Sequence, residues 1–230
     1  MLYIVATPIG NLEDVTLRAL SVLKEADYIL AEDTRKTGMM LKRLGIKKKL
    51  VSFFEHNEEA RIPQVISDLR LSKTICLVSS AGTPTVSDPG YKLIRAAREQ
   101  SLPISSLPGA SSVINALALT SLAHERFAFM GYFPRKTGER KRACEKIKAY
   151  GFTFIFFESP FRVSAAIECI YQEAGNVRIA LLREMTKKFE EVIEGDAKEV
   201  LDKLRGRKLR GEVVLVVAAP APEGKRRYLA

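Results

Sequence analysis

The sequence has few of the residues that most often bind metals or form covalent intermediates. Only two histidines and three cysteines occur among its 230 residues. His56 and His124 are too far from any cysteine pair to form a zinc site, so we predict no bound metal. Cys76, Cys144 and Cys169 are odd in number and lie in separate apolar or helical runs. We therefore expect buried, reduced thiols and a cytoplasmic location.

Long apolar runs and several well-known catalytic signatures are absent as well. No stretch approaches the roughly 20 apolar residues that a membrane-spanning helix requires, so no membrane partner is predicted. Residues 1–6 contain no basic residue and are predicted to form a strand rather than a signal peptide. The Gly-x-Gly-x-x-Gly fingerprint, the P-loop and the Gly-x-Ser-x-Gly elbow do not occur. These absences disfavour covalent catalysis and favour a transfer reaction that depends on positioning the reactants.

Positive charge is in excess, with a formal net charge of +10. Residues 35–49 contain seven Lys and Arg and no acid, residues 135–148 contain seven against two acids, and residues 203–210 contain five more. Clusters of this kind suit a polyanion, because each neutralised phosphate releases counterions. Solvated helix faces are the alternative, but the charge favours a nucleic-acid partner.

The first half of the chain alternates predicted strands and helices. The segments between strands carry apolar residues at helical spacing, and Asn57 is predicted to cap one of these helices. Repeated strand–helix units with near-continuous apolar strands are typical of a parallel sheet. We therefore predict an α/β domain with a mostly parallel sheet over residues 1–109. Its strands are expected at residues 2–6, 28–31, 50–54, 75–78 and 103–107.

The second half has a different pattern and predicts an α+β domain with a mixed sheet over residues 110–219. Ser159-Pro160 is predicted to begin a helix, with a capping side chain followed by a proline at the first position. Asp196 with Glu199 resembles a capping box for a later helix. Residues 220–230 are predicted to form a flexible basic tail. The strands of this half are expected at residues 127–132, 152–157, 177–182, 189–193 and 213–218.

Two loops rich in glycine and proline follow predicted strands, after Ala6 and after Ser79. In parallel sheets, ligands bind beyond the carboxyl ends of the strands. Glycine and proline keep the backbone close to a ligand, and exposed backbone amides bind carboxylate or ribose oxygens. Each loop alone is more often a simple tight turn, but the two together favour a nucleotide-like ligand.

A series of short motifs occurs in one order along the chain. The motifs are TPIGNLED at 7–14, EDTR at 32–35, AGTP at 81–84 with SDPG at 87–90, PG at 108–109, ERF at 125–127, ESP at 158–160 with Arg162, and REMTK at 183–187. Each motif alone is weak, but the ordered set is specific. It closely resembles the ribosomal RNA small subunit methyltransferase I family, within the tetrapyrrole methylase superfold, over about residues 2–218.

The resemblance implies two α/β domains of the tetrapyrrole methylase type in a homodimer that binds S-adenosylmethionine. It further implies methylation of the ribose 2′-oxygen of a cytidine in the decoding region of 16S rRNA, as naked RNA or in the small ribosomal subunit. Ser80, Phe161 and Ala110 stand where the family commonly has an aspartate, a histidine and a proline. By motif position, the residues implied to bind the cofactor are Pro8, Ala81, Gly82, Thr83, Ser87, Asp88, Ser111, Phe133 and Leu182.

Methyl transfer from a sulfonium to a hydroxyl is an in-line displacement, so aligning the reactants supplies much of the barrier reduction. A ribose hydroxyl is a poor nucleophile, and a nearby group must take its proton or stabilise the developing alkoxide. We predict Asp33 and Lys136 as the catalytic residues, the alternative for each being a surface ion pair. RNA contacts are predicted for Arg35, Lys36, Arg135, Lys136, Arg140, Lys141 and Arg142.

Two other functions stay open on the sequence alone. A small-molecule methylase acting on a tetrapyrrole precursor would share the superfold but would not need the basic clusters. A noncatalytic RNA-binding or ribosome-associated protein would need those clusters but would not bind S-adenosylmethionine. Cofactor binding and the salt dependence of RNA affinity therefore separate the three.

Overall fold

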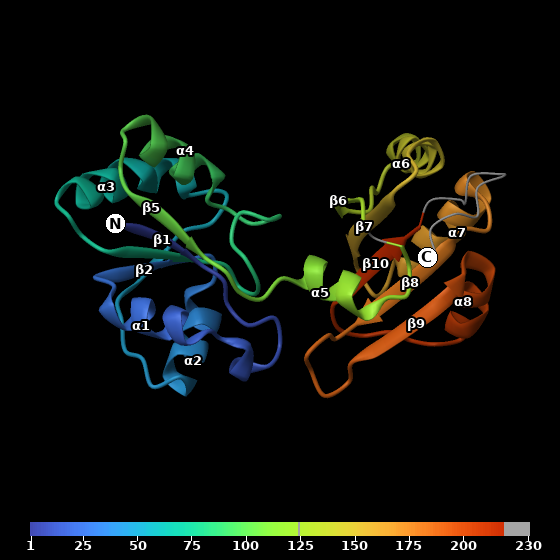
Figure 1. Cartoon of the computed structure of the whole chain (residues 1–230), viewed down its shortest axis with the longest axis horizontal. Coiled ribbons are helices and arrows are strands. Elements are labelled where there is room, and N and C mark those ends of the chain that lie inside the picture. The colour runs from blue at the N-terminus through green and yellow to red at the C-terminus, as the bar shows by residue number, and fades with distance from the viewer. Residues whose placement is uncertain (124, 219–230) are drawn as a thin grey trace. The chain divides into compact units, whose positions relative to one another are not determined.

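The computed structural model describes residues 1–123 and 125–218, and Figure 1 shows the course of the chain. The chain divides into two compact units, Met1–Ser111 and Ser112–Ala230, called here the first and the second unit. The predicted domain boundary, after residue 109, lies two residues before this division. His124 and the predicted tail at residues 220–230 lie outside the described residues.

The first unit contains a five-stranded sheet in the order β3-β2-β4-β1-β5. Each pair of neighbouring strands is parallel, which confirms the predicted parallel sheet. Every residue of β2 and β4 is buried, and this explains why both strands are continuous apolar runs in the sequence. The strands are β1 (Leu2–Val5), β2 (Tyr28–Ala31), β3 (Leu50–Ser52), β4 (Ile75–Val78) and β5 (Ile104–Leu107).

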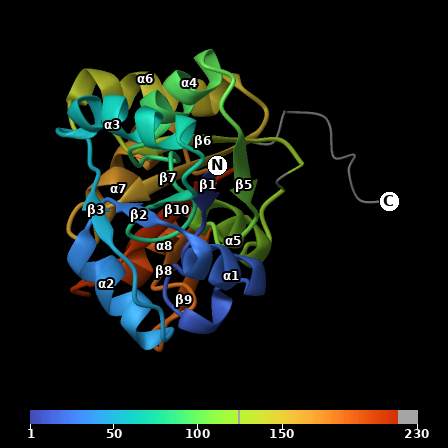
Figure 2. The same ribbon diagram turned by 90° about the vertical axis from the view of Figure 1, so that its left-hand side faces the viewer.

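Two pairs of helices enclose this sheet. Figures 1 and 2 show α1 (Leu17–Glu25) and α2 (Thr34–Arg43) on one side, and α3 (Glu58–Arg70) and α4 (Tyr91–Glu99) on the other. Each pair contributes to its own hydrophobic cluster with the sheet. The side chains alternate along a strand, so Ile29 packs in the α1–α2 cluster and the adjacent Leu30 in the α3–α4 cluster. A short 3-10 helix, η1 (Leu12–Asp14), precedes α1.

Asn57 is the N-cap residue of α3, as predicted, but its side chain does not cap the helix. Its backbone is already in the right-handed helical region, and its side chain makes no hydrogen bond to the start of α3. The Asn57 side chain instead accepts a hydrogen bond from the Phe54 backbone N–H at 2.8 Å and donates one to the Ser52 carbonyl at 3.2 Å. It therefore stabilises the turn between β3 and α3.

The second unit contains a mixed five-stranded sheet in the order β6-β7-β10-β8-β9, as predicted. Strands β6 (Phe127–Tyr132) and β7 (Thr153–Glu158) are parallel. Strand β10 (Val213–Val217) lies antiparallel between β7 and β8 (Arg178–Arg183). Strand β9 (Glu191–Asp196) forms the far edge, antiparallel to β8.

The helices of the second unit are α5 (Ser112–Leu119), α6 (Thr137–Ala149), α7 (Val163–Ala174) and α8 (Ala197–Leu204). Helices α6, α7 and α8 pack on one face of the sheet, which Figure 1 shows. Buried side chains from these three helices join Phe154 and Phe156 of β7 in one hydrophobic cluster. Helix α5 contacts β10. The structure thus confirms the predicted α/β fold class, with a parallel sheet in the first unit and a mixed sheet in the second.

Helix α7 begins at Val163, so the predicted start at Ser159-Pro160 is wrong. The Ser159 hydroxyl oxygen accepts a hydrogen bond from the Phe161 N–H at 3.3 Å, within a turn that precedes the helix. Ser159 therefore caps that turn rather than α7. The other local prediction is confirmed, since Asp196 and Glu199 form a capping box at the start of α8.

All three cysteines are free thiols, as predicted, and Cys76 and Cys144 are buried while Cys169 is partly exposed. Burial raises the pKa of the Cys76 thiol to about 12, so it stays protonated at neutral pH. Across residues 1–123 and 125–218, none of the helices has the length and apolar composition that a bilayer crossing requires.

Candidate functional site

Strands β1 and β4 are neighbours in the first sheet, and the chain leaves them in opposite directions. After β1 it passes through α1, on one face, to β2; after β4 it passes through α4, on the other face, to β5. In open α/β sheets, ligands bind at such a switch point, beyond the carboxyl ends of the two strands. The two loops singled out in the sequence follow β1 and β4, so the fold brings them to the position expected for a ligand.

Hydrogen bonds join the loops that follow β1, β4 and β5. Thr7 and Gly82 pair through both backbone groups, with each N–H to carbonyl distance at 2.9 Å. The Thr83 hydroxyl donates to the Ala110 carbonyl at 3.0 Å, which attaches the loop after β5. The three loops therefore form one preorganised ligand edge, defined here as residues 7–10, 79–90 and 108–110.

Two glycines of the ligand edge allow close packing that a side chain would prevent. A Cβ atom on Gly109 would lie 2.7 Å from the Cβ of Ala6. A Cβ atom on Gly90 would lie 2.5 Å from Cδ2 of Leu77, and Gly90 has a φ of +127°. Both separations are far below an ordinary carbon–carbon contact. These glycines therefore set how closely the loops approach the ends of the strands.

The loop after β4 also holds non-glycine residues in the left-handed backbone region. Thr85 has a φ of 73° and Ser87 a φ of 66°. Residues with side chains adopt this region rarely and at an energetic cost, and such residues gather at ligand-binding and catalytic sites. This strain is a second, independent sign that the loop after β4 is functional.

Two carboxylates give the ligand edge its electrostatic character. The Glu32 carboxylate, directly after β2, accepts a hydrogen bond from the Ser80 N–H at 3.0 Å. Burial raises the pKa of Asp88 to about 6, the negative charge of Glu32 acts in the same direction, and a hydrogen bond from Ser79 opposes both. Paired carboxylates that are partly desolvated favour a ligand with a positive charge or hydroxyl donors.

Six of the predicted cofactor residues lie together on the ligand edge. Gly82 is buried, Ser87 is exposed, and the others are partly buried. Ser111 is the last residue of the first unit. The six residues are Pro8, Ala81, Gly82, Thr83, Ser87 and Asp88.

The remaining predicted cofactor residues, Phe133 and Leu182, lie in the second unit with buried side chains. Phe133 is 1% exposed and packs edge-on against Phe156 in the hydrophobic core. Leu182 is fully buried in β8, between its partners Val192 and Val214. The backbone N–H of Phe133 already donates to the Phe157 carbonyl at 3.0 Å. A hydrogen bond from a ligand to the backbone of Phe133 would therefore use the Phe133 carbonyl oxygen.

Asp33, a predicted catalytic residue, is the N-cap of α2. Its carboxylate accepts hydrogen bonds from the backbone N–H groups of Arg35 at 2.9 Å and Lys36 at 3.2 Å. The hydrogen bond from Lys36 is the main cause that lowers the pKa of Asp33, and the cationic side chains of Arg35 and Lys36 add to it. Asp33 is therefore a weak base with a structural task at the start of α2.

Lys136, the other predicted catalytic residue, is the N-cap of α6, and its side chain is 83% exposed. Its ammonium group lies 3.7 Å from the Glu139 carboxylate. The Arg140 guanidinium folds back and donates to the Pro134 carbonyl at 2.9 Å. Together with the exposed Arg135, Lys141 and Arg142, these residues form a basic surface over the loop after β6 and the first turns of α6.

A buried ion pair between Glu158 and Arg162 follows β7. The Glu158 side chain is 0% exposed, and its Oε1 lies 2.5 Å from Nη2 of Arg162 and 2.6 Å from the Ser159 N–H. Within the described part of the chain, the buried Oε2 of Glu158 and Nη1 of Arg162 have no hydrogen-bond partner. The signal in the sequence was the motif ESP with Arg162, which marks the position without revealing the pairing.

The loop after β8 also holds non-glycine residues in the left-handed backbone region. Glu184 has a φ of 52° and Thr186 a φ of 64°. The Lys187 ammonium donates to the carboxylates of Glu184 and Glu212, at 2.9 Å each. Burial acts to lower the pKa of Lys187, but these two carboxylates raise it overall, so Lys187 stays charged. The motif REMTK marks this loop in the sequence.

Comparison with known proteins places the chain among methyltransferases. The family model of the tetrapyrrole (corrin/porphyrin) methylases matches residues 1–201. The ribosomal RNA small subunit methyltransferase I of Halalkalibacterium halodurans is 44% identical over 216 residues, which cover 94% of this chain and 75% of that protein. The protein of the same name from Neisseria meningitidis is 43% identical over 230 residues, which cover 99% and 79%.

Solved structures show the same fold at much lower sequence identity. A uroporphyrin-III-C-methyltransferase from Thermus thermophilus superposes with a TM-score of 0.66 and 21% identity, over 95% of this chain and 94% of that one. A cobalt precorrin-4 methyltransferase superposes with a TM-score of 0.68 and 16% identity, over 94% of each chain. These structural likenesses confirm the fold and leave the acceptor of the methyl group to other observations.

Proposed function

The chain belongs to the ribosomal RNA small subunit methyltransferase I family, within the tetrapyrrole methylases, and from this premise we propose that it methylates rRNA of the small ribosomal subunit with S-adenosylmethionine. The finer proposal is transfer to the ribose 2′-oxygen of a cytidine in the decoding region of 16S rRNA. The observation that carries the proposal is the 44% identity over 94% of the chain to an rRNA methyltransferase, against 16–21% for the tetrapyrrole enzymes of the same fold.

The ligand edge suits S-adenosylmethionine, which supplies an electrophilic methyl group on a sulfonium when bound. We propose that backbone groups of the loops after β1 and β4, other than those of the paired Thr7 and Gly82, bind its carboxylate and ribose. Glu32 and Asp88 add negative charge that complements the cationic sulfonium and amino groups. The cofactor contacts proposed on this ground are Pro8, Ala81, Gly82, Thr83, Ser87 and Asp88, with Ser111, Phe133 and Leu182 proposed from motif position alone.

Basic residues near the start of α2 and α6 are the proposed RNA contacts. Arg35 and Lys36 are exposed in the first turn of α2, and Arg135, Lys141 and Arg142 are exposed at α6. Lys136 and Arg140 complete this second group. A tetrapyrrole acceptor would not require these cations, whereas RNA phosphates do.

Asp33 and Lys136 are the proposed catalytic residues. An ammonium group such as that of Lys136 would stabilise the alkoxide that develops as the ribose hydroxyl attacks. The lowered pKa of Asp33 suits a hydrogen bond that orients the hydroxyl rather than strong proton abstraction.

A homodimer in the cytoplasm is part of the same proposal. Strand β6 is an edge strand, and its side chains Phe127, Met130 and Tyr132 are exposed, with Tyr132 at 62%. Exposed apolar side chains on an edge strand favour pairing with another chain. Sedimentation equilibrium should show a dimer, and Tyr132→Lys should shift it toward the monomer. A monomer across micromolar concentrations in the unsubstituted protein would contradict this part.

The decisive experiment uses S-adenosylmethionine labelled on its methyl group. The protein is incubated with naked 16S rRNA, with assembled small subunits and with uroporphyrinogen, and modified nucleotides are mapped by mass spectrometry. The proposal expects one methylated cytidine ribose in the rRNA. Methylation of the tetrapyrrole alone, or of a nucleobase, would overturn it.

A further inference from the structure

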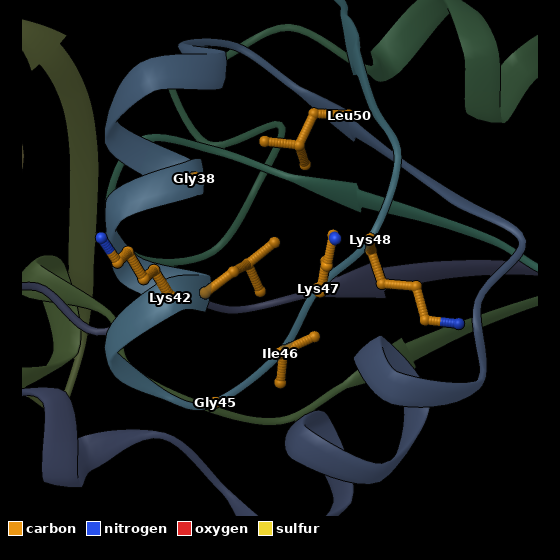
Figure 3. Close-up of a pocket in the computed structure, with 8 residues that line it drawn as sticks. Gly38, Lys42, Gly45, Ile46, Lys47, Lys48 and Leu50 are labelled. Atoms are coloured by element: carbon orange, nitrogen blue, oxygen red, sulfur yellow. The ribbon is translucent and has the colours of Figure 1, made fainter.

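A pocket of about 420 Å³ lies between α2 and the segment that leads from α2 into β3. Figure 3 shows α2 on one side of it and residues 45–50 on the other, with the side chain of Leu50 pointing toward α2. Leu41 and Ile46, which also line it, are buried at 2% and 6% exposure. The volume lies within the roughly 300–1,000 Å³ of typical ligand pockets.

This pocket is separate from the ligand edge. Helix α2 begins at Thr34, next to the carboxyl end of β2, and ends at Arg43. A helix of that length spans about 15 Å. The pocket continues to Leu50, the first residue of β3, so it lies toward the amino ends of the parallel strands.

The charged residues that line the pocket are all cations. Lys42, Lys47 and Lys48 line it, and residues 34–54 contain no acidic residue. Lys48 is occupied, because its ammonium donates to the carbonyl of Ala26 at the end of α1 at 2.7 Å. Lys42 and Lys47 are exposed, and among the described residues neither forms an ion pair. The pocket thus combines an apolar floor with two available positive charges at its rim.

We propose that this α2–β3 pocket binds a nucleotide of the RNA that is not the methylated one. The apolar floor would contact the face of an unpaired base, and Lys42 and Lys47 would neutralise the phosphates on either side of it. Single-stranded RNA offers such a unit, a planar base between two anionic groups, whereas an acidic peptide offers charge without the planar apolar face. The inference rests on the proposed function, since it takes the polyanion to be the rRNA substrate.

The charge part of the proposal is tested with a fluorescein-labelled single-stranded RNA of mixed sequence and fluorescence anisotropy over a range of salt concentrations. Lys42→Gln with Lys47→Gln should weaken binding several-fold. The slope of log affinity against log salt should fall by about 2, one for each phosphate that is no longer neutralised. The matched control is Arg70→Gln with Arg98→Gln, which removes two exposed charges from α3 and α4 on the other face of the same sheet. It should bind as the unsubstituted protein does.

A second variant tests the cavity without changing charge. Gly38 lines the pocket from α2, and a Cβ atom there would meet Leu50 Cδ1 at 3.5 Å, an ordinary contact. Gly38→Ala should therefore fold normally and bind RNA as before. Gly38→Leu should fill the pocket and weaken RNA binding several-fold with an unchanged salt slope, because the phosphate contacts remain.

Methyl transfer separates failure of the pocket from failure of the proposed function. Both pocket variants should raise KM for 16S rRNA and leave kcat and the affinity for S-adenosylmethionine unchanged. The proposed role of the pocket is overturned if the unsubstituted protein and both variants bind RNA with equal affinity, or if none of them binds RNA. It is also overturned if the Arg70 and Arg98 control loses as much affinity as the pocket variants. RNA binding through the pocket with no methyl transfer by the unsubstituted protein contradicts the proposed function alone.

Discussion

The carboxyl end of β4 in the first unit and that of β7 in the second are built by different interactions. After β4, the main-chain pair of Thr7 and Gly82, glycine contacts and the Thr83 hydroxyl join the neighbouring loops, with no ion pair among these contacts. After β7, a side-chain ion pair between Glu158 and Arg162 organises the turn into α7. The first arrangement leaves backbone groups and carboxylates for a small ligand. The second is built around a buried charge that depends on one cation. Substitutions in each unit should therefore affect stability and ligand binding differently.

The largest expected effect is on the ion pair of the second unit. Arg162→Ala leaves the fully buried Glu158 carboxylate without its cation and should lower the free energy of unfolding by about 3–5 kcal/mol. Urea denaturation measures the change. Arg95→Ala, which breaks the exposed pair with Glu99, is the control and should leave stability nearly unchanged. A similar small effect for Arg162→Ala would mean that the ion pair does not organise this turn.

Next in size is the effect of one substitution from each unit on methyl transfer. Lys136→Ala should lower kcat by about 100-fold if its ammonium stabilises the developing alkoxide. Asp33→Asn preserves a good N-cap for α2, so the fold should be unchanged. Any loss of kcat would then show that the Asp33 carboxylate acts on the ribose hydroxyl. Binding of S-adenosylmethionine, measured by calorimetry, should be unchanged in both. Full activity in both variants would remove these two residues from the catalytic machinery.

The glycine contacts of the first unit predict a smaller effect. Gly90→Ala places a Cβ atom 2.5 Å from Leu77 Cδ2 at a φ of +127°, and should lower the free energy of unfolding by about 1–3 kcal/mol. It should also weaken binding of S-adenosylmethionine. The matched control is Gly138→Ala in α6, where an added Cβ meets nothing within 4 Å. That change should be neutral or slightly stabilising. Unchanged cofactor affinity in Gly90→Ala would argue against a preorganised ligand edge.

The smallest effect concerns the pH dependence of the first unit. The folded-state pKa of Asp88, about 6, exceeds its ordinary value of 3.8, mainly because of burial. Protonated Asp88 therefore favours the folded state, and this contribution is complete below about pH 4 and is lost as the pH rises through about 6. The difference in the free energy of unfolding between Asp88→Asn and the unsubstituted protein should shift by about 1–2 kcal/mol in favour of the variant from pH 4 to pH 8. Urea denaturation at each pH measures the gain, and parallel pH curves for the two proteins would contradict the raised pKa.

Much of the fold could be predicted because burial leaves a direct mark on the sequence. Strands β2, β4 and β6 match the predicted ranges residue for residue, and the first two are buried at every position. The errors at Asn57 and Ser159 have one cause. Both side chains bond to backbone groups of a nearby turn, and the same residue types serve helix caps, so composition does not distinguish the two uses.

The candidate site was predictable in its loops and less so in its charges. The glycines and prolines after Ala6 and Ser79 marked the ligand edge, because tight turns and close approaches need those residues. The contact of Glu32 with Ser80 joins residues 48 apart, and the charge of Glu32 contributes to the raised pKa of Asp88. The N-cap role of Asp33, in contrast, is visible in the sequence, since an acid directly before a helix is a recognisable N-cap signal.

The sequence by itself determined the strand–helix order, the ligand loops, the basic clusters and the family, because each depends on residue types at local or ordered positions. Only the tertiary structure decided that Thr7 pairs with Gly82, that Arg162 neutralises a buried Glu158, and that α2 and β3 enclose a pocket. Such pairings join segments that are distant in the sequence. They depend on strand order and burial, which local residue propensities do not determine.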